Sequence, residues 1–196
     1  MAGRRPNVNA PNAAPGTTVD PRRLTLDGLR PLLVNGLVVA AGLDPVQVSG
    51  TGQADQVPSV LWDNGSDRLL VHLAGVKVAL GDGFVEVFLV VECDQTRQSA
   101  IAVTLVTTSM RRPAGFLLAS EDRPRGPAVI VDTWGEALLA LAWRALVEVA
   151  RVVAASAGRD QFDRPFVAST VVATPEALVI TPMVPHLLSD GPEPRT

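Results

Sequence analysis

The side chains that could do chemistry in this 196-residue sequence are few and far apart. It has one cysteine, Cys93, and two histidines, His72 and His186. A nucleophilic cysteine needs a neighbouring cation that favours the thiolate, but the residue after Cys93 is Asp94. A zinc site needs three or four ligands at short spacings, and neither histidine has such neighbours. We therefore predict no catalytic residue, no metal site and no cofactor.

An enzyme that assembles its site in space is the alternative. It would have to bring His72 or Cys93 against a carboxylate in a cleft. The sequence has neither a G-x-S-x-G nucleophile elbow nor a Walker A loop, and its GTG and GDG triplets are typical of turns. Acidic residues such as Asp63 and Asp67 lie in expected turns, where carboxylates are usually solvated. We therefore expect a protein that is not an enzyme.

Two arginine-proline turns, MRRPAG and EDRPRGP, suggest an anion site. If residues 116–120 form one strand between them, the turns lie about 17 Å apart, at about 3.3 Å per residue, and cannot form one cluster. The net charge of −3 also lacks the basic excess with which proteins bind a phosphate backbone. We therefore predict no nucleic-acid partner.

The composition and the two ends of the chain indicate one domain with polar extensions. The chain is 47% hydrophobic with a mean hydropathy of +0.25, and its length suits a single core. Residues 1–23 and 189–196 are rich in proline and polar residues, which predicts a flexible arm and a flexible tail around a single domain at 24–188. No apolar run typical of a signal peptide follows the first arginines, so we expect a cytoplasmic protein.

The clearest structural signal is a hairpin in residues 69–93. Asp82-Gly83 separates two runs rich in valine and leucine, which predicts a two-residue type I′ turn that pairs Gly81 with Phe84. In that register the residues from Val76 to Leu89 that share one face are all apolar. The other face receives Lys77 and Glu86 among apolar residues, so it is half apolar.

The remaining patterns complete an α+β fold. Strands are predicted at 99–108, 116–120 and 128–131, and PFVASTVVAT and ALVITPMV read as a C-terminal hairpin. Apolar spacing predicts an N-terminal helix at about 26–41. We thus expect an antiparallel β-meander of about five strands plus the C-terminal hairpin, packed against that helix and one long apolar helix at about 134–157.

The long helix is predicted to begin at a capping box, Thr133 with Glu136, and to end at Gly158. It is long enough to cross a bilayer, but charged residues such as Arg144 and Arg151 fall in its middle. Each would cost about 2.5–3.5 kcal/mol there, so we predict no membrane span.

The apolar arc of this helix is wider than one sheet covers, so either the first helix or another subunit must pack on it. The candidate interface residues are Leu139, Trp143, Leu146, Val149 and Val153 on the helix, with Phe88 and Val90 on the sheet. The fold-level arrangement is broadly similar to that of small partner-binding chaperones and phage assembly proteins. We therefore expect a non-enzymatic assembly, scaffold or chaperone-like protein that associates with itself or with a protein partner.

A small-molecule or lipid-binding module is the alternative function. The long helix would then lie over a curved sheet with an apolar cavity between them. The candidate cavity-lining residues are Phe84, Phe88, Trp134 and Trp143.

Overall fold

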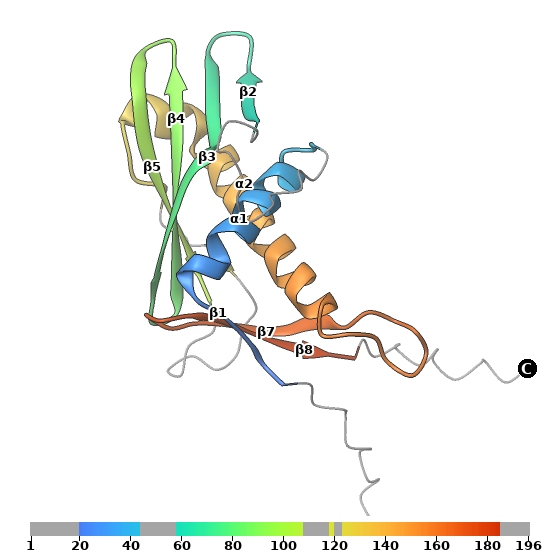
Figure 1. Cartoon of the computed structure of the whole chain (residues 1–196). Helices are drawn as coiled ribbons and strands as arrows, with labels where there is room; N and C mark the ends of the chain where they lie inside the picture. The colour runs from blue at the N-terminus through green and yellow to red at the C-terminus, as the bar shows by residue number, and fades with distance from the viewer. Residues whose placement is uncertain (1–19, 44–57, 108–117, 120–122, 185–196) are drawn as a thin grey trace, which may run out of the picture.

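The structure is a computed structural model that describes residues 20–43, 58–107, 118–119 and 123–184. In chain order the elements are β1 Arg22–Leu24, α1 Leu26–Ala40, β2 Ser59–Asp63, β3 Arg68–Gly81, β4 Phe84–Cys93, β5 Thr96–Val106, β6 Leu118–Ala119, α2 Ala128–Ala155, β7 Val167–Ala173 and β8 Leu178–Met183. This confirms the predicted α+β class (Figure 1). Arg22 and Arg23, expected in the flexible arm, belong to β1. Residues 1–19 of that arm and the expected tail lie outside the described residues.

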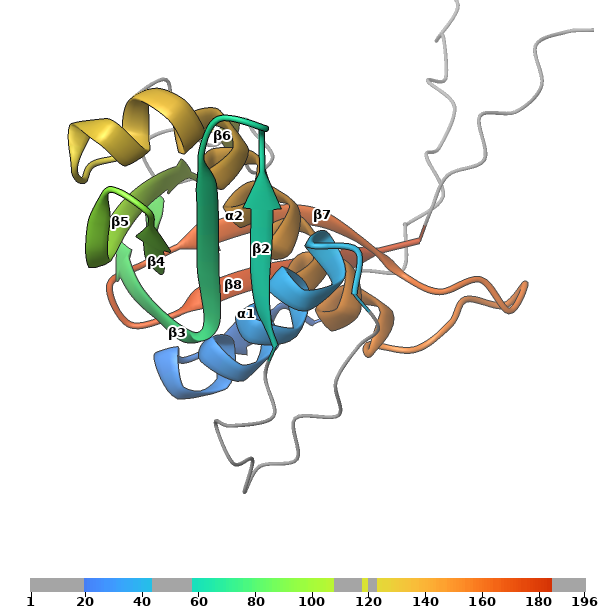
Figure 2. The same cartoon turned by 90° about the horizontal axis from the view of Figure 1, so that it is seen from above.

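The strands form two antiparallel sheets. The larger has the order β2-β3-β4-β5-β6, and the smaller, with the order β1-β8-β7, is the predicted C-terminal hairpin with β1 added to its edge. Figure 2 shows α1 on the β2–β3 side of the molecule and the first turns of α2 on the β5 side. The larger sheet therefore has helices packed on one of its faces.

The β3–β4 hairpin has the predicted register, with Leu80 opposite Val85 and Gly81 opposite Phe84. Its turn differs from the predicted type I′. Gly83 has a φ of +83°, but Asp82 has no positive φ, and type I′ requires a positive φ at both central residues. A positive φ at the second central residue alone is typical of a type II turn, in which only the glycine adopts a left-handed conformation.

The long helix begins earlier than predicted. α2 starts at Ala128, so the prediction of a strand at 128–131 is wrong. The β-branched residues there favour a strand locally. In the structure Ile130 lies one helical turn before Trp134, however, and both side chains are buried in the core. Burial at helical spacing therefore outweighs local propensity.

The predicted ends of this helix change accordingly. Thr133 lies inside α2, so it forms no capping box with Glu136. The N-cap residue is Pro127, and no side chain caps this end. At the other end α2 stops at Ala155, shortly before Gly158, whose φ is +119°.

The buried face of α2 rotates around the helix axis along its length. Its first half buries Ile130, Trp134, Leu138 and Leu141, and its second half buries Leu146, Val149, Ala150 and Val153. The first half packs on the larger sheet, and the second half packs between α1 and the smaller sheet (Figure 1). The larger sheet, α1 and the smaller sheet thus share the wide apolar arc of α2. The first helix covers much of the apolar surface that a single sheet would leave exposed.

The predicted N-terminal helix is confirmed as α1, and it packs very closely on α2. A Cβ atom added to Gly36 would lie 2.5 Å from the carbonyl oxygen of Ala145, which no real contact allows. The glycine inside this helix is therefore explained by helix–helix packing, since only a residue without a side chain lets the backbones approach so closely.

Candidate functional site

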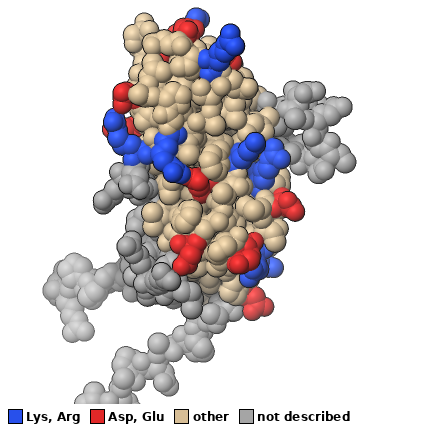
Figure 3. All heavy atoms as spheres, turned by 90° about the vertical axis from the view of Figure 1, so that its left-hand side faces the viewer, with Lys and Arg blue, Asp and Glu red and all other residues tan. Residues whose placement is uncertain are grey.

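The face of the larger sheet that is turned away from α1 and α2, here called the outer face, is the best candidate for a functional surface. Strand pleating directs alternate side chains to this face. Its residues on the central strands are Lys77 and Ala79 of β3, Phe84, Glu86, Phe88 and Val90 of β4, and Ala100, Ala102, Thr104 and Val106 of β5. Figure 3 looks onto this side of the molecule and shows charged side chains spread among large uncharged areas. The outer face is therefore mixed, as the sequence predicted.

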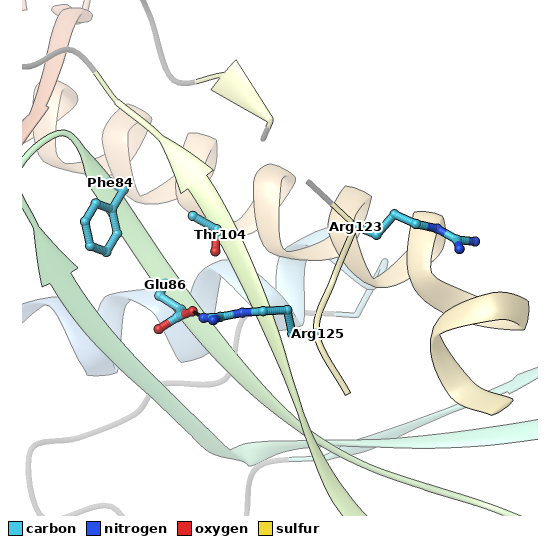
Figure 4. A pocket seen from close by; sticks show the side chains of 5 residues that line it. All are labelled: Phe84, Glu86, Thr104, Arg123 and Arg125. Atoms are coloured by element: carbon cyan, nitrogen blue, oxygen red, sulfur yellow. Dashed lines mark hydrogen bonds and ion pairs between the residues drawn. The ribbon is translucent and has the colours of Figure 1, made fainter. Parts of the chain in front are cut away.

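A hollow of about 560 Å³ lies on the outer face (Figure 4). Its lining residues are Phe84, Glu86, Thr104, Arg123 and Arg125. Glu86 lies directly opposite Thr104 across β4 and β5. In Figure 4 the side chain of Arg125 reaches toward Glu86, whereas that of Arg123 points away from the others. Besides Arg123, the hollow is thus lined by one aromatic ring, one hydroxyl and one ion pair.

The backbone of Arg125 explains how this ion pair is positioned. Its N–H donates to the carbonyl of Ala102 and its own carbonyl accepts from the N–H of Ala102, both at 2.8 Å. These two bonds fix Arg125 beside β5, and its guanidinium crosses the sheet to the Glu86 carboxylate. The Glu86 side chain is only 15% exposed, whereas that of Arg125 is 72% exposed. Arg125 therefore covers Glu86 while remaining open to a partner.

Phe84 forms the apolar side of the hollow. Its ring lies over Gly81, where an added Cβ would come within 2.2 Å of the ring. The residue is nevertheless 40% exposed, and Phe88 and Val90 on the same strand are half-buried. An exposed aromatic ring beside a charged pair is a feature of recognition surfaces.

A row of polar side chains crosses the other end of the outer face. The Ser59 hydroxyl is 3.1 Å from Nδ1 of His72, and Nε2 of His72 is 3.7 Å from a carboxylate oxygen of Glu92. This row places a hydroxyl, an imidazole and a carboxylate in series, and the sequence reasoning missed it because the three residues lie on different strands. The 3.7 Å separation is too long for a hydrogen bond, and the hollow on the outer face does not include these residues.

The other residues considered for chemistry are held in structural contacts. Cys93 is a buried free thiol, 3.7 Å from the Thr96 hydroxyl. Asp67, expected to be solvated, is instead buried and accepts a hydrogen bond of 3.3 Å from Nε1 of Trp134. Among the residues that the structure describes, no three His, Cys, Asp or Glu side chains gather where they could bind a metal ion.

The predicted interface residues of α2 fall into two groups. Leu146, Val149 and Val153 are buried inside the chain, against α1 and the smaller sheet, and Val149 and Val153 also line the hollows between α1, α2 and β1. Leu139 is partly buried, and Trp143 is 37% exposed.

The predicted cavity residues do not surround one space. Phe84 and Phe88 belong to the outer face, on the side of the sheet opposite α2. Trp134 is buried on the inner side, where its ring centroid is 6.1 Å from that of Trp62. Trp143 lies on an exposed part of α2. The cavity between the helix and the sheet that these residues would line is therefore not formed by them.

No protein-family model, curated protein or solved structure matches this chain. Neither helix in the described part of the chain combines the length and the apolar character needed to span a membrane.

Proposed function

We propose that this chain is a non-enzymatic, chaperone-like or assembly protein that binds a protein partner on its outer face. One observation carries the proposal: both helices of the described structure pack on the opposite face of the sheet, and the outer face keeps exposed apolar side chains. Leu61 of β2 is 59% exposed and Phe84 is 40% exposed. A sheet face of this kind is where a partner packs.

The composition of the outer face supports a protein partner. Phe84 and Phe88 supply aromatic surface, and Arg125 supplies an exposed guanidinium, the residue types that are enriched in protein–protein interfaces. Two of the basic residues beside this face already pair with acids, Arg125 with Glu86 and Arg68 with Asp94. A surface with such paired charges favours a mixed protein surface over a polyanion.

Site-specific photocrosslinking in the source cells tests this proposal. A photoreactive phenylalanine analogue at Phe88 should give a discrete crosslinked protein band. The same analogue at Phe162 is the matched control, because Phe162 is 68% exposed but lies in the loop before β7, away from the sheet. A second copy of this chain or another protein in the Phe88 band supports the proposal. No band at Phe88, or the same bands at Phe162, contradicts it.

A further inference from the structure

A groove between α1 and α2 is a second surface, separate from the outer face. Its lining residues are Leu32, Asn35, Gly36 and Val39 of α1 with Glu148, Val149, Arg151 and Val152 of α2. A neighbouring hollow beside β1 shares Leu32 and Val152 with it, so the two hollows are adjacent, and together they are called the groove here. Their volumes are about 240 and 420 Å³. Val39 and Val152 are more than a third exposed, on opposite walls of the groove.

The spacing of the walls fits a helix. The residues that α1 contributes lie three, four and seven positions apart, so they form one ridge along that helix. The α2 wall has a similar spacing, from Val149 through Val152 to Ser156. Two such ridges on crossing helices leave a channel into which the ridge of a third helix packs.

The charged side chains at the α2 wall of the groove are paired, whereas, within the described part of the chain, those at its β1 end are not. At the α2 wall the Arg151 guanidinium donates to both oxygens of Glu148, at 2.5 and 2.7 Å, so the two charges neutralise each other. The hydrogen bond from Arg151 lowers the pKa of Glu148, which stays ionised. At the β1 end Arg22 and Arg23 are exposed and make no ion pair with any described residue. Among the described residues, the unpaired charge of the groove is therefore positive and lies at its β1 end.

Asn35 adds a polar group to the α1 wall. The side-chain oxygen of Asn35 is buried and accepts no hydrogen bond within the described part of the chain. A buried carbonyl without a donor is unfavourable, so this oxygen lowers the stability of the chain.

We propose that this groove binds an amphipathic helix of a partner protein, with carboxylates at the end of that helix beside Arg22 and Arg23. The apolar side chains of the helix contact Leu32, Val39 and Val152. A lipid chain fits less well, because apolar ligands are mostly enclosed by their pockets, whereas both hollows of this groove are open to solvent. This site goes beyond the proposed function of the outer face and is tested independently of it.

The test uses a fluorescent 16-residue helical peptide as the probe, with leucines along one face and two glutamates in its first turn. Fluorescence anisotropy should show saturable binding to the full chain. Val152→Asp should weaken binding by about tenfold or more, because a carboxylate facing apolar side chains costs at least the ~1.4 kcal/mol to which tenfold corresponds. Val147→Asp is the matched control and should leave binding unchanged. The two valines are on the same helix and are equally exposed, at 39% and 40%, but Val147 does not line the groove.

Reversing the charges of Arg22 and Arg23 tests whether the carboxylates of the bound helix lie beside these two residues. Arg22→Glu with Arg23→Glu should weaken binding of the glutamate peptide, and a peptide with two lysines in the same positions should recover it. Val39→Asp on the opposite wall gives a second groove variant should Val152→Asp fail to fold by circular dichroism. Phe88→Asp should bind the peptide normally, which separates this site from the outer face.

Three results would overturn the proposal. The first is the absence of saturable binding to the unmodified chain, and the second is an equal loss for Val147→Asp and Val152→Asp. The third is a dimer by light scattering that Val152→Asp converts to a monomer, which would assign the groove to a second copy of this chain.

Discussion

The two faces of β4 follow the same pleat but have different surroundings. On the inner face Val85, Val87 and Leu89 are at most 1% exposed, because α1, α2 and the neighbouring strands cover them. On the outer face Phe84 is 40% exposed and Phe88 is half-buried. Pleating thus separates the two sets of side chains, while the number of packing layers decides which set becomes core. In the part of the chain that the structure describes, helices cover only one of these faces.

The largest effect is expected when neighbouring residues of β4, one on each face, are replaced separately by aspartate. Val87→Asp should lower the free energy of unfolding by about 3–5 kcal/mol, because it buries an unpaired charge. Phe88→Asp, one residue further along, should cost about 1 kcal/mol or less, because its carboxylate reaches water. Urea unfolding followed by circular dichroism measures both. Similar losses for the two variants would show that the outer face is also covered.

The inner side is also sensitive to added volume at the crossing of the two helices. Gly36→Ala should lower the free energy of unfolding by about 1–3 kcal/mol, since its methyl group would meet the Ala145 backbone. Gly28→Ala in the same helix is the control. Its nearest contact would be 3.9 Å away, so it should raise stability by up to about 1 kcal/mol through helix propensity. A stabilising effect of both alanines in thermal melts would contradict the close helix contact.

A comparable effect is expected for the buried polar contact of the inner side. Trp134→Phe keeps the aromatic packing on Trp62 but removes the hydrogen bond to Asp67. The carboxylate then lacks one donor, so the free energy of unfolding should fall by about 1–3 kcal/mol. An unchanged denaturant midpoint would mean that water or another donor replaces the indole.

The smallest effect on stability is expected in the loop that links α2 to β7, which lies outside the helices and the two sheets. Burial is the largest influence on Asp160 and raises its pKa, but hydrogen bonds from Arg164 and from the Phe162 N–H outweigh burial and lower the pKa. The stabilisation is therefore complete above the ordinary aspartate pKa of about 3.9, and it is lost as the pH falls through the lower folded value.

The measurement for this loop is a pair of thermal melts. Asp160→Asn should lower the melting temperature at pH 7 and have a smaller effect at pH 3, which is below the ordinary aspartate pKa of about 3.9, so that the unfolded chain already binds the proton. Asp163→Asn is the control, because the Asp163 side chain is 85% exposed, in contrast to 4% for Asp160. An equal effect of Asp160→Asn at both pH values would exclude the charged contact.

The candidate sites were predictable to different degrees. The half-apolar outer face follows from alternation in residues 84–93, so Phe88 could be placed on it from the sequence. The Glu86–Arg125 pair could not, because it joins β4 to a residue bonded to the edge of β5. The row from Ser59 to Glu92 and the α1–α2 groove depend in the same way on long-range pairing.

By itself the sequence determined the α+β class, the register of the β3–β4 hairpin and the position of α1. Each of these follows from local spacing, which fixes how side chains alternate or repeat along one element. Tertiary structure alone decided that residues 128–131 are helical, that Gly36 lies against Ala145, and which part of the apolar arc of α2 stays exposed. These outcomes depend on which distant surfaces cover a segment, and burial by distant elements contributes more free energy than the local preferences that oppose it.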